Sequence, residues 1–318
     1  MRGAFLDFGS VAEGGDLDTA SLAAVLPGIE VYDETAEELL VPRLAGKGVA
    51  VANKALFTRA VLAACPELRL IALTATGVNN VDVAAARERG IAVCNIRDYC
   101  TASVVQHVFA TLLALTHGLR EYDRLLKAGA WEHARHFTML TYPVRELAGL
   151  TLGIVGYGTL GRGVARVAEA FGMQVLVANR AGGAREAGRV DLDELLARAD
   201  VLTLHCPITP ATRHLIGRAQ LARMKPGAVL INTARGALVD PAALAEALRA
   251  GRLGGAAIDV LEEEPPVSGS PLLAPDLGNL IATPHTAWAA HESRQRAIDE
   301  VAANIQDFLA GGRRNRVD

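Results

Sequence analysis

The sequence predicts an α/β protein built on two parallel sheets, and two observations lead to that prediction. Short runs of β-branched residues alternate with runs rich in alanine and leucine along the chain, which is typical of βαβ units. At 318 residues, the chain is long enough for about two domains that each bury a core. We therefore expect two α/β domains, one of them organised around a doubly wound sheet.

The first part of the chain is expected to form a small α/β domain in its own right. Its strands are predicted at residues 4–8, 29–32, 49–51, 68–75 and 91–95, with helices between them. A last helix, over residues 292–309, has the length and position to pack back on this domain. The smaller domain would then be made from both chain ends.

The second part of the chain is expected to form the doubly wound sheet. Its six strands are predicted at residues 152–155, 175–178, 201–205, 228–232, 256–260 and 280–282. One helix start is well marked, because Asp240 can accept hydrogen bonds as the N-cap and Pro241 suits the first helical position. A long helical run over residues 101–127 is expected to bridge the two domains.

Composition argues against several classes of protein. The formal net charge is −3 and 21% of residues are charged, without the basic excess of a nucleic-acid binder. The N-terminus has no long apolar run, and Gln106, His107 and His117 interrupt the most apolar helical stretch, so no membrane segment is expected. The four cysteines show neither CxxC nor metal-finger spacing. We expect a reduced, cytoplasmic protein without a metal site.

A glycine motif, Gly156, Gly158 and Gly161 in the spacing GxGxxG, follows the first predicted strand of the larger domain. The first glycine permits a tight turn, the second lets backbone approach a pyrophosphate, and the third lets helix pack on strand. The pyrophosphate would lie at the helix N-terminus, where free N–H groups favour an anion. The motif alone is weak, but its strand and helix context indicates a Rossmann-type dinucleotide domain.

The end of the next predicted strand bears on which dinucleotide is bound. Asn179 stands where an aspartate or glutamate would bind the adenosine ribose of NAD, and Arg180 follows it. Without a carboxylate, a ribose 2′-phosphate is not repelled, and the guanidinium could pair with it. We expect NADP(H) or NAD(H), with a slight preference for NADP(H). The alternative is that Asn179 bonds a ribose hydroxyl while Arg180 stacks beside the adenine.

Three further residues follow later strands of the same sheet: Arg235, Glu264 and His285. Each has an ordinary structural explanation when taken singly, as a surface arginine, part of an acidic run, or a loop histidine. Together they lie at the edge where doubly wound sheets bind ligands. They are therefore the candidate catalytic residues.

These motifs together resemble the D-isomer-specific 2-hydroxyacid dehydrogenases, and two further stretches, residues 99–115 and 284–317, look most like the glycerate dehydrogenase and hydroxypyruvate reductase branch of that family. The resemblance covers nearly the whole chain and is carried by the glycine motif, Thr233-Ala234-Arg235-Gly236, Asp259 with Glu264-Pro265, and Thr283-Pro284-His285. It implies a Rossmann-type doubly wound parallel sheet domain over residues 100–285 that binds NAD(P). It also implies a smaller flavodoxin-like α/β substrate domain from residues 1–99 and 286–318.

The resemblance also implies roles for individual residues. Arg235, Glu264 and His285 would be the catalytic triad, and Asp259 would hold the nicotinamide carboxamide. The segment 74–82 is similar to the family's substrate loop, so the amides of Thr76 and Gly77 would receive a substrate carboxylate. Further cofactor contacts would come from Thr159, Leu160, Cys206, Pro207, Thr212, Thr233, Ala234 and His285. Residues 101–150 resemble the dimerisation region, so we expect a homodimer, although the same apolar stripe could be internal core.

The chemistry of 2-keto acid reduction is consistent with these roles. Arg235 offers a permanently charged planar fork for the substrate carboxylate and keto oxygen. His285 can give a proton to that oxygen, and an ionised Glu264 beside it would favour imidazolium and fix its tautomer. We expect a small substrate such as hydroxypyruvate or glyoxylate, with Trp288 either lining its pocket or only filling a gap. Two alternatives stay open: an enzyme like D-3-phosphoglycerate dehydrogenase, and a dinucleotide-sensing, corepressor-like binding protein of the same fold.

Overall fold

The computed structural model describes all residues from Met1 to Asp318 and divides them into two compact units. The first unit contains Met1–Cys100 and Trp288–Asp318, and the second contains Thr101–Ala287. The expected division, 1–99 with 286–318 and 100–285, differs from this by one residue at the first joint and two at the second. The first unit is thus discontinuous in sequence, whereas the second is a single stretch of chain.

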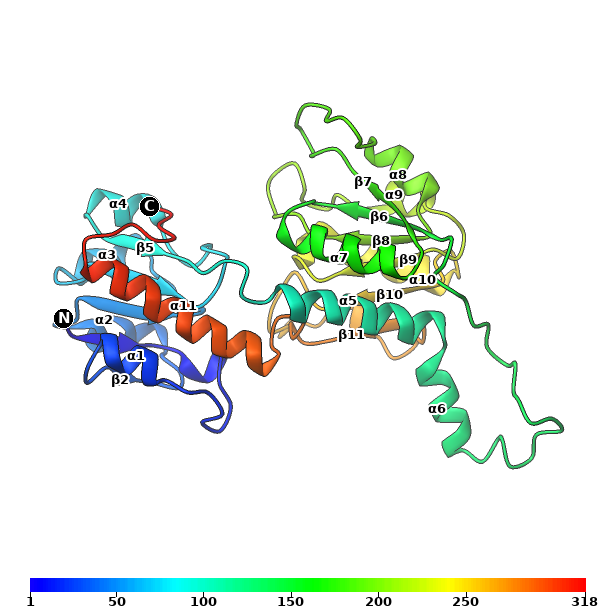
Figure 1. The fold of residues 1–318 in the computed structure, drawn as a ribbon, viewed down its shortest axis with the longest axis horizontal. Helices are drawn as coiled ribbons and strands as arrows, with labels where there is room; N and C mark the ends of the chain where they lie inside the picture. Colours follow the sequence, from blue (N-terminus) through cyan, green and yellow to red (C-terminus); the bar gives the residue numbers. More distant parts are fainter. The chain divides into compact units, whose positions relative to one another are not determined.

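The first unit is a five-stranded parallel sheet in the order β2-β1-β3-β4-β5 (Figure 1), which is the flavodoxin-like order. Its strands are β1 Gly3–Phe5, β2 Glu30–Val31, β3 Val49–Ala52, β4 Leu70–Leu73 and β5 Ala92–Cys94. Its helices are α1 Ala20–Val25, α2 Leu40–Leu44, α3 Arg59–Ala64, α4 Val83–Glu88 and α11 His291–Leu309, with short 3₁₀ turns at Phe8–Ser10 and Glu37–Leu39. α11 and α1 cover one face, where Ile298 and Val301 pack among strand residues such as Phe5 and Leu70.

The second unit is a six-stranded parallel sheet in the order β11-β10-β9-β8-β6-β7. Its strands are β6 Thr151–Val155, β7 Gln174–Val177, β8 Val201–Leu204, β9 Val229–Asn232, β10 Gly255–Ile258 and β11 Leu280–Ala282. The order reverses between β6 and β8, which makes their carboxyl ends the expected ligand-binding edge. The α/β fold with two parallel sheets, predicted from sequence, is confirmed.

Helices cover both faces of the second sheet (Figure 1). They are α5 Thr101–Thr116, α7 Thr159–Ala170, α8 Leu192–Arg198, α9 Arg218–Arg223 and α10 Pro241–Arg249, with 3₁₀ turns η3 Gly236–Leu238 and η4 Pro271–Leu273. A further helix, α6 Leu119–Lys127, follows α5 and projects away from the sheet. On one face, Val108 of α5 and Val164 of α7 pack against Ile154. On the other, α8, α9 and α10 pack around Leu202 and Leu230. The predicted start of α10 is confirmed, because the Asp240 side chain accepts from the N–H groups after Pro241.

The single helix expected over residues 101–127 is wrong. α5 and α6 are two helices bent by 57°, because Gly118 between them takes the left-handed conformation at φ 59°. α5 buries one side against the sheet, whereas α6 buries none of its residues. No single helix is long and apolar enough to cross a membrane. The bent pair α5 and α6 together has the length and composition of a membrane span.

Candidate active site

The glycine motif has the geometry of a phosphate cradle. Gly156 has φ 96°, and a Cβ there would lie 2.5 Å from the backbone of His205. A Cβ on Gly161 would lie 2.2 Å from the carbonyl oxygen of Gly156, so helix and strand pack closely. At Gly158 a Cβ would meet nothing within 4 Å, which leaves open space before the first N–H groups of α7, at Thr159 and Leu160. The motif therefore fits a dinucleotide pyrophosphate.

At the end of β7, the Asn179 amide is engaged within its own loop. Its Nδ2 donates to Asp191 Oδ1 over 3.0 Å, and its Oδ1 accepts from the Glu186 amide over 3.0 Å. The sequence did not single out Asp191, whose other oxygen pairs with Arg185. The exposed side chain of Arg180 makes no hydrogen bond or ion pair. A free guanidinium thus follows Asn179, the position at which ribose binding is expected.

The loop after β8 carries the expected contacts Cys206, Pro207 and Thr212. The hydroxyl of buried Thr212 donates to the Pro207 carbonyl over 2.9 Å and accepts from the Thr209 amide over 2.7 Å, so it closes the loop. Burial raises the pKa of the Cys206 thiol. Burial also lowers the pKa of His205 to about 4, and its Nδ1 is buried without a partner. His205 was missed from sequence, although it is a polar residue directly after a buried strand.

The loop after β9 places Thr233, Ala234 and Arg235 at the same edge of the sheet. Thr233 Oγ1 is buried and has no hydrogen-bond partner, as expected of a group that meets a bound ligand. Ala234 accepts from Arg235 Nη1 over 2.6 Å and donates to Asn232 Oδ1 over 3.0 Å. Arg235 makes no ion pair, so its charge is available to an anion.

Glu264 and His285 form a hydrogen-bonded pair. Glu264 Oε2 lies 2.7 Å from His285 Nδ1, and Oε1 accepts from the Leu261 amide over 2.8 Å. An ionised carboxylate has only acceptors, so Nδ1 carries the hydrogen and Nε2 is left for the reaction. Both side chains are about one-third exposed. The pair is therefore oriented yet accessible.

Asp259 is 2% exposed and holds the segment that carries His285. Its carboxylate accepts from the amides of Thr286 and Ala287 over 2.8 and 2.9 Å and from Thr283 Oγ1 over 2.6 Å. Its own carbonyl accepts from the His285 amide over 2.7 Å. The sequence implied a cofactor contact for Asp259 and gave no sign of this anchoring, which depends on how the two loops meet.

The remaining candidates, Thr76, Gly77 and Trp288, belong to the first unit. The backbone amides of Thr76 and Gly77 donate no hydrogen bond within the chain, while the Thr76 hydroxyl donates to the Ile96 carbonyl over 2.9 Å. Trp288 packs on the α11 face of the sheet, with its ring edge-on to Tyr99 at 6.3 Å between centroids. That packing favours the gap-filling interpretation of Trp288.

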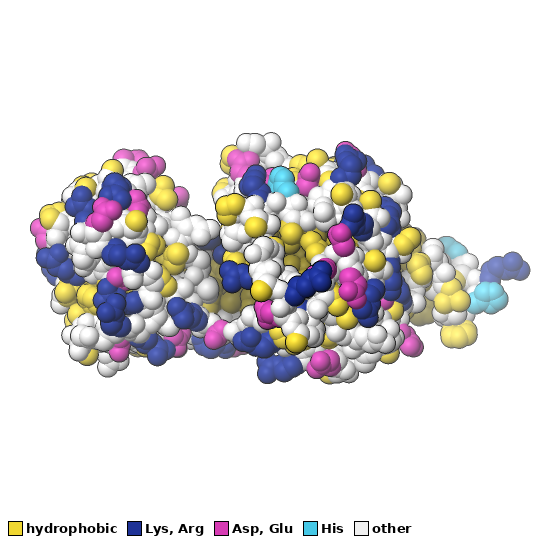
Figure 2. All heavy atoms as spheres, turned by 90° about the horizontal axis from the view of Figure 1, so that it is seen from above, with side chains coloured by type: hydrophobic (Ala, Val, Ile, Leu, Met, Phe, Trp, Pro, Cys, Tyr) yellow, Lys and Arg dark blue, Asp and Glu magenta, His cyan; other side chains and the backbone are white.

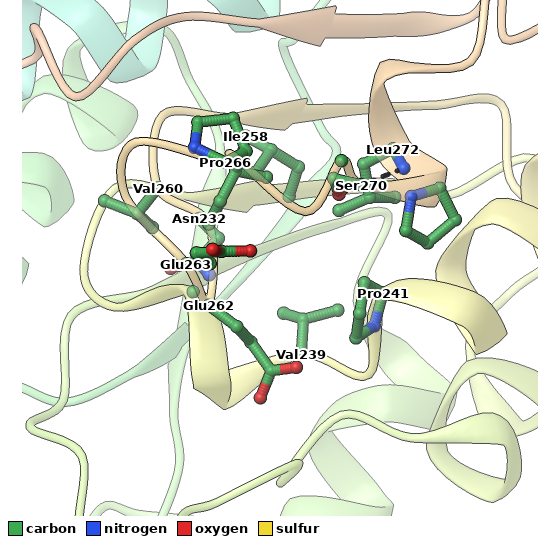
Figure 3. Close-up of a pocket in the computed structure, with 14 residues that line it drawn as sticks. Asn232, Val239, Pro241, Ile258, Val260, Glu262, Glu263, Pro266, Ser270 and Leu272 are labelled. Carbon is green, nitrogen blue, oxygen red and sulfur yellow. Dashed lines mark hydrogen bonds between the residues drawn. The ribbon is translucent and has the colours of Figure 1, made fainter.

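A cavity of ≈ 230 Å³ lies between the loops that follow β9 and β10 (Figure 3). It is lined by Asn232, Gly236, Val239, Pro241, Ile258, Val260, Leu261, Glu262, Glu263, Pro266, Gly269, Ser270, Pro271 and Leu272. Arg235, Glu264 and His285 are not among its lining residues. At one end the loops touch, since a Cβ on Gly236 would lie 1.9 Å from the carbonyl carbon of Leu261. The loops bearing Arg235 and Glu264 thus abut beside a cavity that the three candidate residues do not line.

Comparison with known proteins shows which family this chain belongs to. Residues 109–287 match the family model described as D-isomer specific 2-hydroxyacid dehydrogenase, NAD binding domain. A glycerate dehydrogenase of Methylorubrum extorquens is 44% identical over 288 residues, which are 90% of this chain and 91% of that protein. A hydroxypyruvate reductase of Blautia hydrogenotrophica is 38% identical over 96% of both chains. Among solved structures, the TT0316 protein from Thermus thermophilus superimposes with a TM-score of 0.86 and 36% identity over 100% of both chains.

These matches confirm the resemblance stated from sequence, including the glycerate dehydrogenase and hydroxypyruvate reductase branch. The family model covers more than half of the chain, and both relatives extend over nearly all of it. The chain therefore belongs to the D-isomer specific 2-hydroxyacid dehydrogenases, oxidoreductases that act on the CH–OH group of small 2-hydroxy acids with a nicotinamide dinucleotide as cofactor.

Proposed function

We propose that this protein reduces a small polar 2-keto acid, such as hydroxypyruvate or glyoxylate, to the D-2-hydroxy acid. The observation that carries the proposal is the hydrogen bond of 2.7 Å between Glu264 and His285. The loop that carries Glu264 abuts the loop that carries Arg235, which makes no ion pair. The choice of acid is supported by the relatives named glycerate dehydrogenase and hydroxypyruvate reductase.

In the proposed mechanism, Arg235 binds the substrate carboxylate and polarises the keto oxygen. Its planar fork suits a carboxylate, and no protein carboxylate competes for it. Glu264 accepts a hydrogen bond from His285 Nδ1, so Nε2 is the ring nitrogen left to exchange a proton with the substrate. Nε2 gives a proton to the substrate oxygen in reduction and takes it back in oxidation. The prediction that the Thr76 and Gly77 amides also hold the carboxylate is supported by their free N–H groups.

The nicotinamide dinucleotide, when bound, supplies or accepts the hydride at the substrate carbon. Gly158 and the start of α7 would receive the pyrophosphate, because a Cβ at that glycine would occupy open space. The partnerless Thr233 hydroxyl would meet the cofactor. The proposed slight preference for NADP(H) rests on Arg180, whose guanidinium is free beside an Asn179 that is engaged elsewhere.

We also propose a homodimer. The segment after α6 exposes large apolar side chains that have no core in their own chain: Trp131 is 53% exposed, Phe137 90% and Leu140 85%. Figure 1 shows this segment projecting from the second unit, and Figure 2 shows hydrophobic side chains among basic and histidine side chains at that end. Large apolar side chains exposed to this degree are typical of an interface between subunits.

The proposal is tested by steady-state reduction of hydroxypyruvate, glyoxylate and phenylpyruvate, each with NADPH and with NADH. Fast turnover of the two small acids and slow turnover of phenylpyruvate is the expected result. His285→Ala should then lower kcat steeply with little loss of dinucleotide binding, since the imidazole moves the proton and the glycine motif holds the cofactor. An unchanged kcat in that variant contradicts the role of His285, and no turnover of any acid contradicts the proposed function.

A further inference from the structure

We propose that His107, on α5, is a positioning residue for the catalytic histidine. His107 hydrogen-bonds to the Thr283 hydroxyl, and that hydroxyl hydrogen-bonds to the buried carboxylate of Asp259. The same carboxylate accepts hydrogen bonds from the backbone amides that follow His285. The inference rests on the proposed function, because it assigns a residue to the same reaction. His107 lies on a helix, α5, that contains none of the active-site motifs.

The inner end of this chain of contacts is the carboxylate of Asp259. Oδ1 accepts from the Thr286 amide and Oδ2 from the Ala287 amide, so one side chain holds the two residues after His285. His285 itself has φ 55°, a left-handed conformation that non-glycine residues rarely adopt. Such a conformation persists only where the surroundings impose it. Asp259 imposes it from both sides, through its carboxylate and through its carbonyl.

The middle of the chain of contacts is the Thr283 hydroxyl. It lies 2.6 Å from Asp259 Oδ1 and 3.2 Å from His107 Nε2. A hydroxyl has one hydrogen to donate, and an ionised carboxylate can only accept. The hydrogen of Thr283 therefore goes to Asp259, and Thr283 must accept from His107. This requires a hydrogen on Nε2 of His107 and so fixes its role as the donor.

The outer end is His107 itself, whose side chain is 19% exposed. Its Nε2 lies 3.9 Å from Asp259 Oδ1, and no lysine or arginine forms an ion pair with that carboxylate. A buried carboxylate depends on its few donors, because each lost hydrogen bond leaves a desolvated charge less well compensated. His107 is thus the group that completes the polar surroundings of Asp259 from the helix side.

Four variants test the chain of contacts. His107→Leu keeps the bulk of the side chain and removes the donor, whereas His107→Gln places an amide N–H in its stead. Thr283→Val removes the hydroxyl, and the double variant His107→Leu/Thr283→Val completes a cycle. Gln106→Leu, at an exposed neighbouring position of α5, is the matched control. The measurements are kcat for hydroxypyruvate with saturating dinucleotide, and amide hydrogen exchange of the peptide that contains Thr286 and Ala287.

We expect kcat to fall about tenfold in His107→Leu, the effect of one functional hydrogen bond, and to recover in His107→Gln. The double variant should be no slower than Thr283→Val alone, because His107 acts through the hydroxyl. Exchange of the Thr286 and Ala287 amides should speed up in His107→Leu and in Thr283→Val and stay unchanged in Gln106→Leu. A multiplied loss in the double variant, or wild-type kcat and exchange in His107→Leu, would overturn the inference. The exchange readout needs no turnover, so failure of the proposed function is seen separately, as an inactive wild type.

Discussion

Gly236 is the point at which the loop bearing Arg235 meets the loop bearing Glu264, and Gly236→Ala tests whether that contact sets the catalytic geometry. The added Cβ would lie 1.9 Å from the carbonyl carbon of Leu261, 2.1 Å from its oxygen and 2.4 Å from the Glu262 amide. All three neighbours are backbone atoms, which cannot rotate away as a side chain can. One loop must therefore move.

The size of the movement follows from ordinary contact distances. Restoring about 3.4 Å from the Cβ to Leu261 requires a shift of about 1.5 Å. Glu264 is tied to the Leu261 amide, so it moves with that loop. Its 2.7 Å contact to His285 would lengthen to about 4 Å, beyond hydrogen-bond range. A misplacement of this size costs about 10²-fold in rate, and the strain costs about 1–3 kcal/mol of stability.

The assay is kcat/KM for hydroxypyruvate alongside the thermal unfolding midpoint. Gly278→Ala is the control, because a Cβ there meets nothing within 4 Å and the residue has no positive φ. We expect Gly236→Ala to lose activity far beyond its loss of stability, and Gly278→Ala to match the wild type. A Gly236→Ala variant with wild-type kcat/KM would refute the reasoning that this contact sets the position of Glu264 relative to His285.

Three further predictions concern other parts of the second unit. Burial holds the pKa of His205 at about 4 against an ordinary 6.5, so the unfolded chain binds the proton first. The free energy of unfolding should therefore fall by about 3 kcal/mol as pH drops from 6.5 to 4, and denaturant titrations of His205→Gln should show that much less pH dependence; an equal slope in both proteins would assign it to other groups. Arg180→Ser should raise KM for NADPH and leave KM for NADH unchanged, and equal effects on the two would remove the 2′-phosphate site. Phe137→Asp with Leu140→Asp should halve the mass measured by light scattering, whereas a wild-type protein that is already monomeric would exclude the dimer.

Most strands of both sheets could be predicted, because each is a short β-branched run between helical stretches. The predicted runs were too long where polar or loop residues followed the strand: residues 68–75 were expected, and β4 covers Leu70–Leu73. The break between α5 and α6 was missed because Gly118 is a single glycine within an apolar helical pattern. Its left-handed conformation is set by the surrounding packing, which sequence does not display.

Within the candidate site, sequence could single out the residues proposed to carry the chemistry, and it could not predict the contacts that hold them. Glu264 and His285 are recognisable by type and by place at the ends of strands, and they prove to be hydrogen-bonded. The engagement of Asn179 with Asp191 depends on how a loop folds back across β7. The support that Asp259 gives to the segment after His285 likewise depends on contacts between loops.

The discontinuity of the first unit has a consequence for the order of folding during synthesis. Its sheet face is closed by α11, whose Ala297, Ile298, Val301 and Ile305 are fully buried there, and residues after α11 bond to Val93 of β5. A ribosome therefore delivers the beginning of this unit first and its covering helix last. The continuous second unit can fold in the interval, while the first waits with an apolar sheet face exposed. The nascent chain should need chaperone protection over Met1–Cys100 until α11 has been made.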